Sequence, residues 1–223
     1  MKLLNKALVI AWKDILSETR AKEIISSVLV FAILVIVIFN FAFSGSQQDM
    51  LLLAPGILWV TFSFAGILSL NRSFIQEKEE NCLEGLMVCP VSCEAIYLGK
   101  MLSSLFFILF IEAVVLPVFG LLFNVNVITL PLVTLTLLTT IGFVAVGTLF
   151  SALAVNTRAR EMVLPILFFP IVAPIIIAAV NASELTLSGA PLGELASWLG
   201  IIAAFDIIFL TASYLTFAFI VEE

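Results

Sequence analysis

Long apolar stretches separated by short polar segments make up most of the chain after residue 23. Six of them are long enough to cross a bilayer, since one span needs about 20 apolar residues. They cover residues 24–43, 51–70, 101–123, 130–155, 162–180 and 199–221. Continuous apolar runs such as 28–39 lack the strict alternation of a membrane β-barrel. The pattern predicts an all-α membrane protein in which residues 1–223 form one domain with six transmembrane helices.

The composition agrees with a membrane protein. Charged residues are only 12% of the 223 residues, about half of the ~25% that soluble domains carry. The first apolar run is of full span length and follows some 23 mixed residues, so we expect no cleavable signal peptide. The net charge of −6 argues against nucleic acid as a partner. The lipid bilayer is therefore the first partner that the sequence indicates.

The basic residues predict the orientation. All ten Lys and Arg lie before the first span or in the connections 71–100 and 156–161. The alternate connections, residues 44–50, 124–129 and 181–198, contain none. Cytoplasmic connections carry the excess of Lys and Arg. With six spans, both termini are therefore expected in the cytoplasm.

Residues 2–25 show a second pattern, in which apolar positions recur at helical spacing. These positions are Leu4, Leu8, Ala11, Trp12, Ile15 and Leu16, with Lys6, Lys13, Asp14, Glu18 and Arg20 in the gaps. We expect residues 1–23 to form a helix in the cytoplasmic interface, with Trp12 at headgroup depth and basic residues toward anionic lipid. The alternative is a solvated segment that leads into the first span.

The connection 71–100 contains the most informative polar segment. A charged run ends at Glu80, and Asn81 with Glu84 resembles a capping box. A short helix would then place Leu83, Leu86 and Met87 on one side before Pro90 ends it. This apolar edge needs a contact, either in a groove of another protein or on the membrane surface. Spacing alone leaves both open.

The absence of certain residues and motifs limits the catalytic chemistry that the chain can perform. It has no histidine and no P-loop motif, so it lacks the commonest general base and the phosphate-binding loop of many ATPases. We therefore expect no catalytic residues, no metal site and no enzyme activity. Cys82, Cys89 and Cys93 fall in the 71–100 connection, and we interpret them as structural residues there.

Two acids lie inside predicted spans, Glu112 near the middle of the third and Asp206 in the outer part of the sixth. Such a group faces the bundle interior or a pathway, because ionisable residues are unfavourable in lipid. Ion coupling is one interpretation and a structural hydrogen bond is the other, which we expect for Glu112. Pro165, Pro170 and Pro174 predict that the fifth span is strongly bent or interrupted.

Segment 158–174, with Arg158, Arg160, Glu161 and the three prolines, resembles the signature region of the CcmB family. That family is the membrane subunit of the cytochrome c maturation ABC transporter. Residues 70–74, 83–86, Pro90 and 98–100 resemble the family's loop between spans two and three, and 13–16 resemble its N-terminal helix. The resemblance covers essentially the whole chain. The loop pattern is shared with ABC-2 type permeases, and this chain departs from relatives at Asn81-Cys82 and Cys93.

The resemblance implies a homodimeric ABC-2 type permease in the bacterial cytoplasmic (inner) membrane, each copy docking an ATP-binding subunit, CcmA. It implies that Arg158, Arg160 and Glu161 form a cytoplasmic loop between spans four and five. The ATPase-coupling helix would comprise Glu80, Leu83, Glu84, Leu86 and Met87. CcmC- and CcmD-like membrane proteins and a CcmE-like haem chaperone are implied as further partners.

The function that follows is coupling of ATP hydrolysis to haem export or to release of a haem-loaded chaperone. Haem is then a possible substrate, ATP is bound by the partner, and no cofactor is expected on this chain. An ABC-2 exporter for another lipid or drug-like substrate is the first alternative. An ion-coupled secondary carrier using Glu112 and Asp206 is the second.

Overall fold

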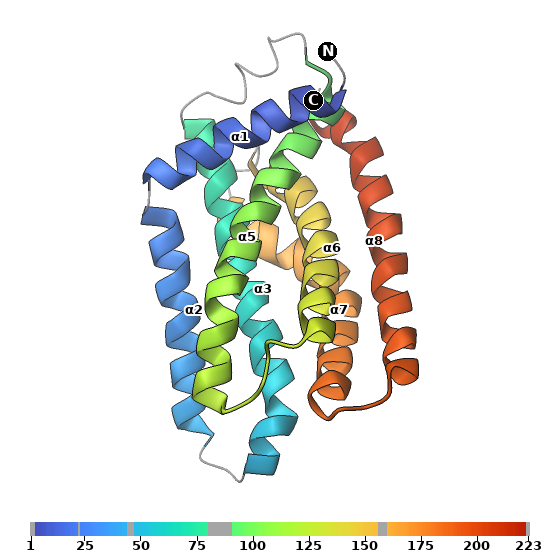
Figure 1. Ribbon diagram of the computed structural model, residues 1–223. Helices are drawn as coiled ribbons and strands as arrows, with labels where there is room; N and C mark the ends of the chain where they lie inside the picture. The colour runs from blue at the N-terminus through green and yellow to red at the C-terminus, as the bar shows by residue number, and fades with distance from the viewer. Residues whose placement is uncertain (1–2, 22, 44–46, 80–90, 156–159, 222–223) are drawn as a thin grey trace.

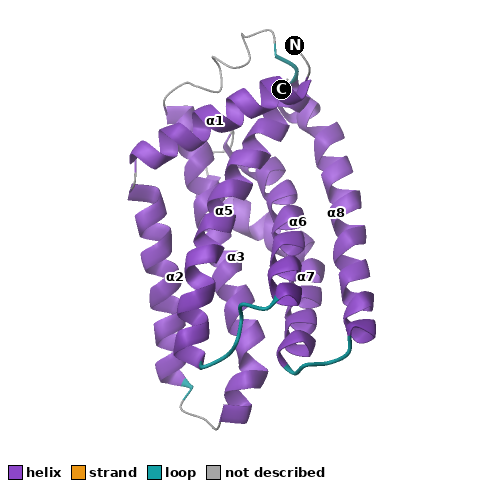
Figure 2. Cartoon of the chain, in the orientation of Figure 1, coloured by secondary structure: helices purple, strands orange, loops and turns teal. Residues whose placement is uncertain are grey.

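The computed structural model describes the chain except for residues 1–2, 22, 44–46, 80–90, 156–159 and 222–223. The described residues form seven helices and no strand (Figure 2). These are α1 (Leu3–Ala21), α2 (Glu23–Ala42), α3 (Gln47–Glu79), α5 (Cys93–Phe123), α6 (Leu130–Val155), α7 (Arg160–Leu187) and α8 (Leu192–Val221). Six of them, α2 to α8, are long and apolar enough to cross a membrane, which confirms the predicted fold class.

The six long helices stand side by side in a bundle, and α1 lies across one end (Figure 1). Helix α6 lies inside the bundle, where it packs against α3, α5, α7 and α8. The spans of α3 and α6 are the most buried, whereas those of α2 and α8 lie at the periphery. Helix α1 begins and α8 ends at the same end of the bundle (Figure 1), as an even number of crossings requires.

Several helices extend beyond the predicted spans. Helix α3 continues to Glu79, although its apolar window ends at Asn71, and α5 begins at Cys93 rather than at residue 101. The connection predicted at 71–100 is therefore helical at both ends. Hydropathy detects where a helix meets lipid, but Gln, Glu and Lys are strong helix formers and carry the same helix into water.

Helix α7 distinguishes between two alternatives for the fifth span and corrects one further expectation. Pro165, Pro170 and Pro174 all lie inside one continuous helix, so the fifth span is not interrupted. Figure 1 shows α7 running across behind α6 and then descending beside it, as expected for a helix that proline bends. The connection predicted at 181–198 is also largely helical, because α7 extends to Leu187 and α8 starts at Leu192.

Helix α1 crosses closely over the start of α5. A Cβ placed on Gly99 would lie 2.7 Å from Cβ of Ile10 and 2.9 Å from the carbonyl oxygen of Ala7, so only glycine allows this approach. The side of α1 that faces the bundle carries Ala7, Ile10, Ala11, Asp14 and Glu18. Its exposed residues include Leu4, Leu8, Trp12 and Leu16. The structure thus confirms a separate N-terminal helix and adds that its acidic residues point inward.

Candidate functional site

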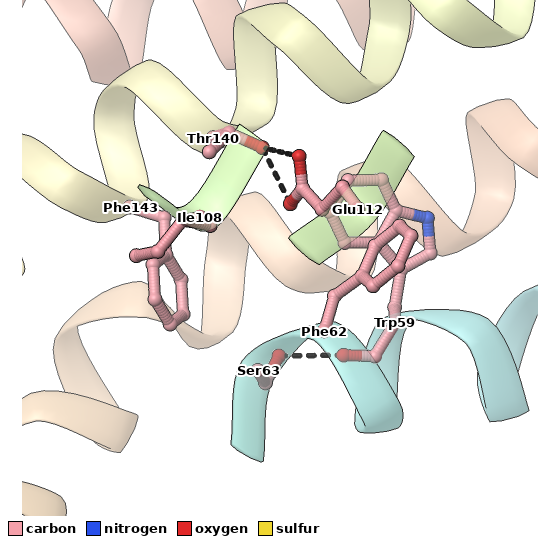
Figure 3. Close-up of a pocket in the computed structure, with 7 residues that line it drawn as sticks. All are labelled: Trp59, Phe62, Ser63, Ile108, Glu112, Thr140 and Phe143. Carbon is pink, nitrogen blue, oxygen red and sulfur yellow. Dashed lines mark hydrogen bonds between the residues drawn. The ribbon is translucent and has the colours of Figure 1, made fainter. Parts of the chain in front are cut away.

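Glu112 lies in the interior of the bundle on α5, with 4% of its surface exposed. Thr140 of α6 faces it, and Thr140 Oγ1 lies 2.8 Å from Oε1 and 3.0 Å from Oε2 of the carboxyl group (Figure 3). The same hydroxyl donates to the carbonyl oxygen of Thr136 at 2.8 Å, one turn back along α6. The buried acid is therefore satisfied by a neighbouring helix without any basic residue.

The hydrogen bonds at Thr140 constrain the protonation of Glu112. A threonine hydroxyl has one proton to donate and two lone pairs that accept. If that proton goes to the carbonyl oxygen of Thr136, which can only accept, the remaining contact requires the Glu112 carboxyl to donate. A neutral Glu112 supplies a second proton, so the Thr136 contact and one of the two carboxyl contacts each have a donor, whereas a carboxylate would compete with Thr136 for one proton. The geometry thus favours the neutral acid.

A cavity of about 10 Å³ lies beside the carboxyl group. Its lining residues are Trp59, Phe62, Ser63, Ile108, Glu112, Thr140 and Phe143 (Figure 3). Ser63 Oγ donates to the carbonyl oxygen of Trp59 at 2.7 Å, so its proton is not available to a molecule in the cavity. Four of the other lining residues, Trp59, Phe62, Ile108 and Phe143, are aromatic or aliphatic. This volume is about that of one water molecule. The Glu112 cavity is therefore not a site for an organic substrate.

Asp206 has a different environment. It lies at the centre of α8, not in the outer part of the sixth span, because α8 begins at Leu192 rather than at residue 199. Its exposed fraction is 7%, and neither carboxyl oxygen has a hydrogen-bond partner among the described residues. A Cβ on Gly142 of α6 would overlap Asp206 Oδ1. The carboxyl group thus occupies a notch in α6 that exists because residue 142 is glycine.

The two acids do not form one site. Glu112 approaches α6 at Thr140 and Asp206 approaches it at Gly142. Successive residues of an α-helix are about 100° apart, so positions 140 and 142 are separated by about 200° around α6. Glu112 and Asp206 therefore lie on nearly opposite sides of α6.

A buried ion pair was missed in the sequence. Lys100 Nζ lies 2.8 Å from Asp14 Oδ2 and Lys13 Nζ lies 3.1 Å from Asp14 Oδ1. The side chains of Lys100 and Asp14 are only 3% and 6% exposed. The sequence places Lys100 among the basic residues of the 71–100 connection, but the residue belongs to α5 and lies beneath α1. The spacing of Ala7, Ala11 and Asp14 on one face of α1 was the available signal.

A second missed contact joins α3 to α7. Trp59 Nε1 donates to Ser183 Oγ at 2.9 Å, and both residues are buried. A buried tryptophan usually finds a partner for its N–H group, but the sequence does not show which helix supplies it. This bond joins α3 to the C-terminal half of α7.

Several predicted site residues remain outside the structural description. Glu80, Leu83, Glu84, Leu86 and Met87 lie outside the described residues, and so does Arg158. Arg160 and Glu161 begin α7, but their side chains are not among those described. Their assigned roles stay predictions. The described residues contain no cluster of three or more His, Cys, Asp or Glu that could hold a metal ion.

Known proteins resemble this chain over most of its length. Heme exporter protein B of Pseudomonas aeruginosa is 27% identical over 177 residues, 79% of each chain. Heme exporter protein B of Paracoccus denitrificans is 30% identical over 186 residues, 83% of this chain and 84% of the relative. The family described as CcmB protein matches residues 5–222. Because that match covers nearly every residue, the chain belongs to the CcmB family.

Proposed function

We propose that this chain is the membrane subunit of an ABC transporter for cytochrome c maturation. The observation that carries the proposal is the CcmB match over residues 5–222, with relatives named heme exporter protein B. The chain would couple ATP hydrolysis by a separate subunit to haem export or to release of a haem-loaded chaperone. The six span-length helices and the lack of a P-loop support this division of labour.

The proposed ATPase contact lies at the end of the bundle that carries α1. Helix α3 ends and α5 begins there (Figure 1), and the predicted coupling segment lies between these two helices in the sequence. That segment holds the predicted coupling residues Glu80, Leu83, Glu84, Leu86 and Met87. A CcmA-like subunit that binds here would act directly on the two helices that flank the segment. Their movement would then reach α6, which both contact.

The remaining partners follow from the family in the same way. We propose a homodimer that assembles with CcmC- and CcmD-like membrane proteins and serves a CcmE-like haem chaperone. Its place is the cytoplasmic (inner) membrane, with both termini in the cytoplasm. The start of α1 and the end of α8 at one end of the bundle, together with the distribution of Lys and Arg, support this orientation. Haem is the proposed substrate, and the Glu112 cavity is too small to hold it.

Complementation tests the proposal. The chain is expressed with its own ATP-binding subunit in a bacterium that lacks its haem exporter protein B. We expect covalent c-type cytochromes, measured by haem staining, to return. Leu83→Asp places an unpaired carboxylate in the proposed apolar contact, so it should abolish both maturation and co-purification of the ATP-binding subunit at normal protein level. A well-expressed complex that leaves cytochrome c unmatured would instead favour another substrate.

A further inference from the structure

Asp206 has less favourable surroundings than the buried acids Asp14 and Glu112. Asp14 is paired with Lys100, and Glu112 is bonded to Thr140. Both oxygens of Asp206 are buried without a partner among the described residues. An ionised carboxylate in such a place is disfavoured unless it is paired or hydrogen-bonded. No side chain of the described residues therefore neutralises Asp206 in this conformation.

The helices that pack against α8 supply no charge for this purpose. These helices are α5, α6 and α7. Residues 130–155 of α6 contain no Asp, Glu, Lys, Arg, Tyr or Cys, and α7 carries such residues only near its two ends, at Arg160, Glu161 and Glu184. On α5, Glu112 is bonded to Thr140 across another face of α6, and the Tyr97 hydroxyl donates to the carbonyl oxygen of Ala145 at 3.1 Å. Lys100, also on α5, is paired with Asp14.

The notch also restricts what Asp206 can bind. A Cβ at position 142 would lie 2.8 Å from a side-chain methyl of Ile175 and 3.1 Å from the ring of Phe205, so the walls around Oδ1 are hydrocarbon. A metal cation such as Mg²⁺ or Ca²⁺ needs six or more oxygen ligands or retained waters. A proton needs only the carboxyl group itself.

We propose that Asp206 and the Gly142 notch form a proton-binding site at the contact between α6 and α8. The carboxyl group occupies the notch as the neutral acid. When the O–H bond breaks, the proton passes to water that reaches the site as α8 moves away from α6, and the carboxylate leaves the notch. Each such separation and return then releases and takes up one proton. The inference does not depend on which molecule the transporter moves.

The chain offers a direct test, because it contains only three aspartates, Asp14, Asp49 and Asp206. Aspartate labelled with ¹³C at its side-chain carboxyl is incorporated into the full chain in lipid vesicles at neutral pH. Infrared or solid-state NMR spectra then separate carboxylic acid from carboxylate signals. We expect Asp206→Asn to remove an acid signal completely and Asp14→Asn to remove a carboxylate signal. Loss of a carboxylate signal in Asp206→Asn would overturn the proposal.

Two further measurements test the link to helix packing. Gly142→Ala fills the notch, so we expect the acid signal of Asp206 to shift while the carboxylate signal of Asp14 stays in place. Raising the pH should lower the Tm of the wild type relative to Asp206→Asn, because only the wild type gains a charge in the notch. An unshifted Asp206 signal, or parallel Tm curves, would refute the proposed coupling. Asp206→Ala serves for both comparisons if the Asn variant does not accumulate.

Discussion

Asp14 and Asp206 carry the same side chain, and their exposed fractions, 5% and 7%, are nearly equal. Asp14 lies where α1 crosses α5 and has two lysines within 3.1 Å. Asp206 lies at the centre of α8 and has no partner among the described residues. Burial alone therefore does not determine what a carboxyl group does. At the α1 end an ion pair holds two helices together, whereas at the centre of α8 we propose that the carboxyl group is neutral.

The largest effect is expected at the ion pair. Lys100→Met keeps the apolar length of the side chain but leaves Asp14 buried beside Lys13, whose side chain is 46% exposed. Removing one member of a buried pair typically destabilises by about 3–5 kcal/mol, so we expect a loss near 3 kcal/mol and release of α1 from α5. Thermal unfolding and limited proteolysis at α1 in detergent measure both changes.

The matched control for this prediction is Lys13→Met. Because Lys13 is half exposed, its removal should cost at most about 1 kcal/mol. Exchange of the two charges in Asp14→Lys with Lys100→Asp should recover part of the stability lost in either single variant. Equal losses of stability in Lys100→Met and Lys13→Met would show that the buried lysine contributes no more than the half-exposed one. The contrast between Asp14 and Asp206 would then not rest on a buried ion pair.

The next effect is expected at the notch. Gly142→Ala introduces a methyl group that overlaps Asp206 Oδ1, and overpacking of this kind typically costs about 1–3 kcal/mol. The loss should be smaller in an Asp206→Ala background, because that change removes the overlapping atom. Gly200→Ala on α8 is the control, since no atom outside its own helix lies within 4 Å of the added Cβ. Losses of equal size with and without Asp206 would mean that the carboxyl group does not occupy the notch.

The six spans could be predicted from sequence because crossing a bilayer demands a minimum apolar length. Helix ends beyond the membrane could not, since the polar residues up to Glu79 favour a helix as strongly as the apolar ones before them. Asp206 was placed too far out for the same reason: the polar start of α8, around Glu194, resembles a connection. The side chains that pair with the buried polar residues could be predicted least of all. Nothing local to Lys100 indicates Asp14, and nothing local to Glu112 indicates Thr140.

The smallest effect is expected at Glu112. Its carboxyl group has a hydrogen-bond partner, unlike that of Asp206, but the partner is the neutral Thr140 and not a lysine as at Asp14. In Glu112→Gln the side-chain amide keeps a donor that can face Thr140 Oγ1. Interhelical hydrogen bonds in membranes contribute about 0.6 kcal/mol on average, and most of that should be retained. We therefore expect stability within about 0.5 kcal/mol of the wild type and normal cytochrome c maturation in the complementation assay.

Glu112→Ala provides the contrast, because it removes the bond to Thr140 and enlarges a cavity that already measures about 10 Å³. Protein level and Tm should fall in this variant, and maturation should fall only in proportion to protein level. Thr140→Val removes the same bond from the opposite helix without enlarging the cavity. Its loss of stability should therefore equal the contribution of the hydrogen bond alone. If Glu112→Gln accumulates normally but matures no cytochrome c, Glu112 must exchange protons during transport. The assignment of a structural role to Glu112, in contrast to the proton-binding role of Asp206, would then be wrong.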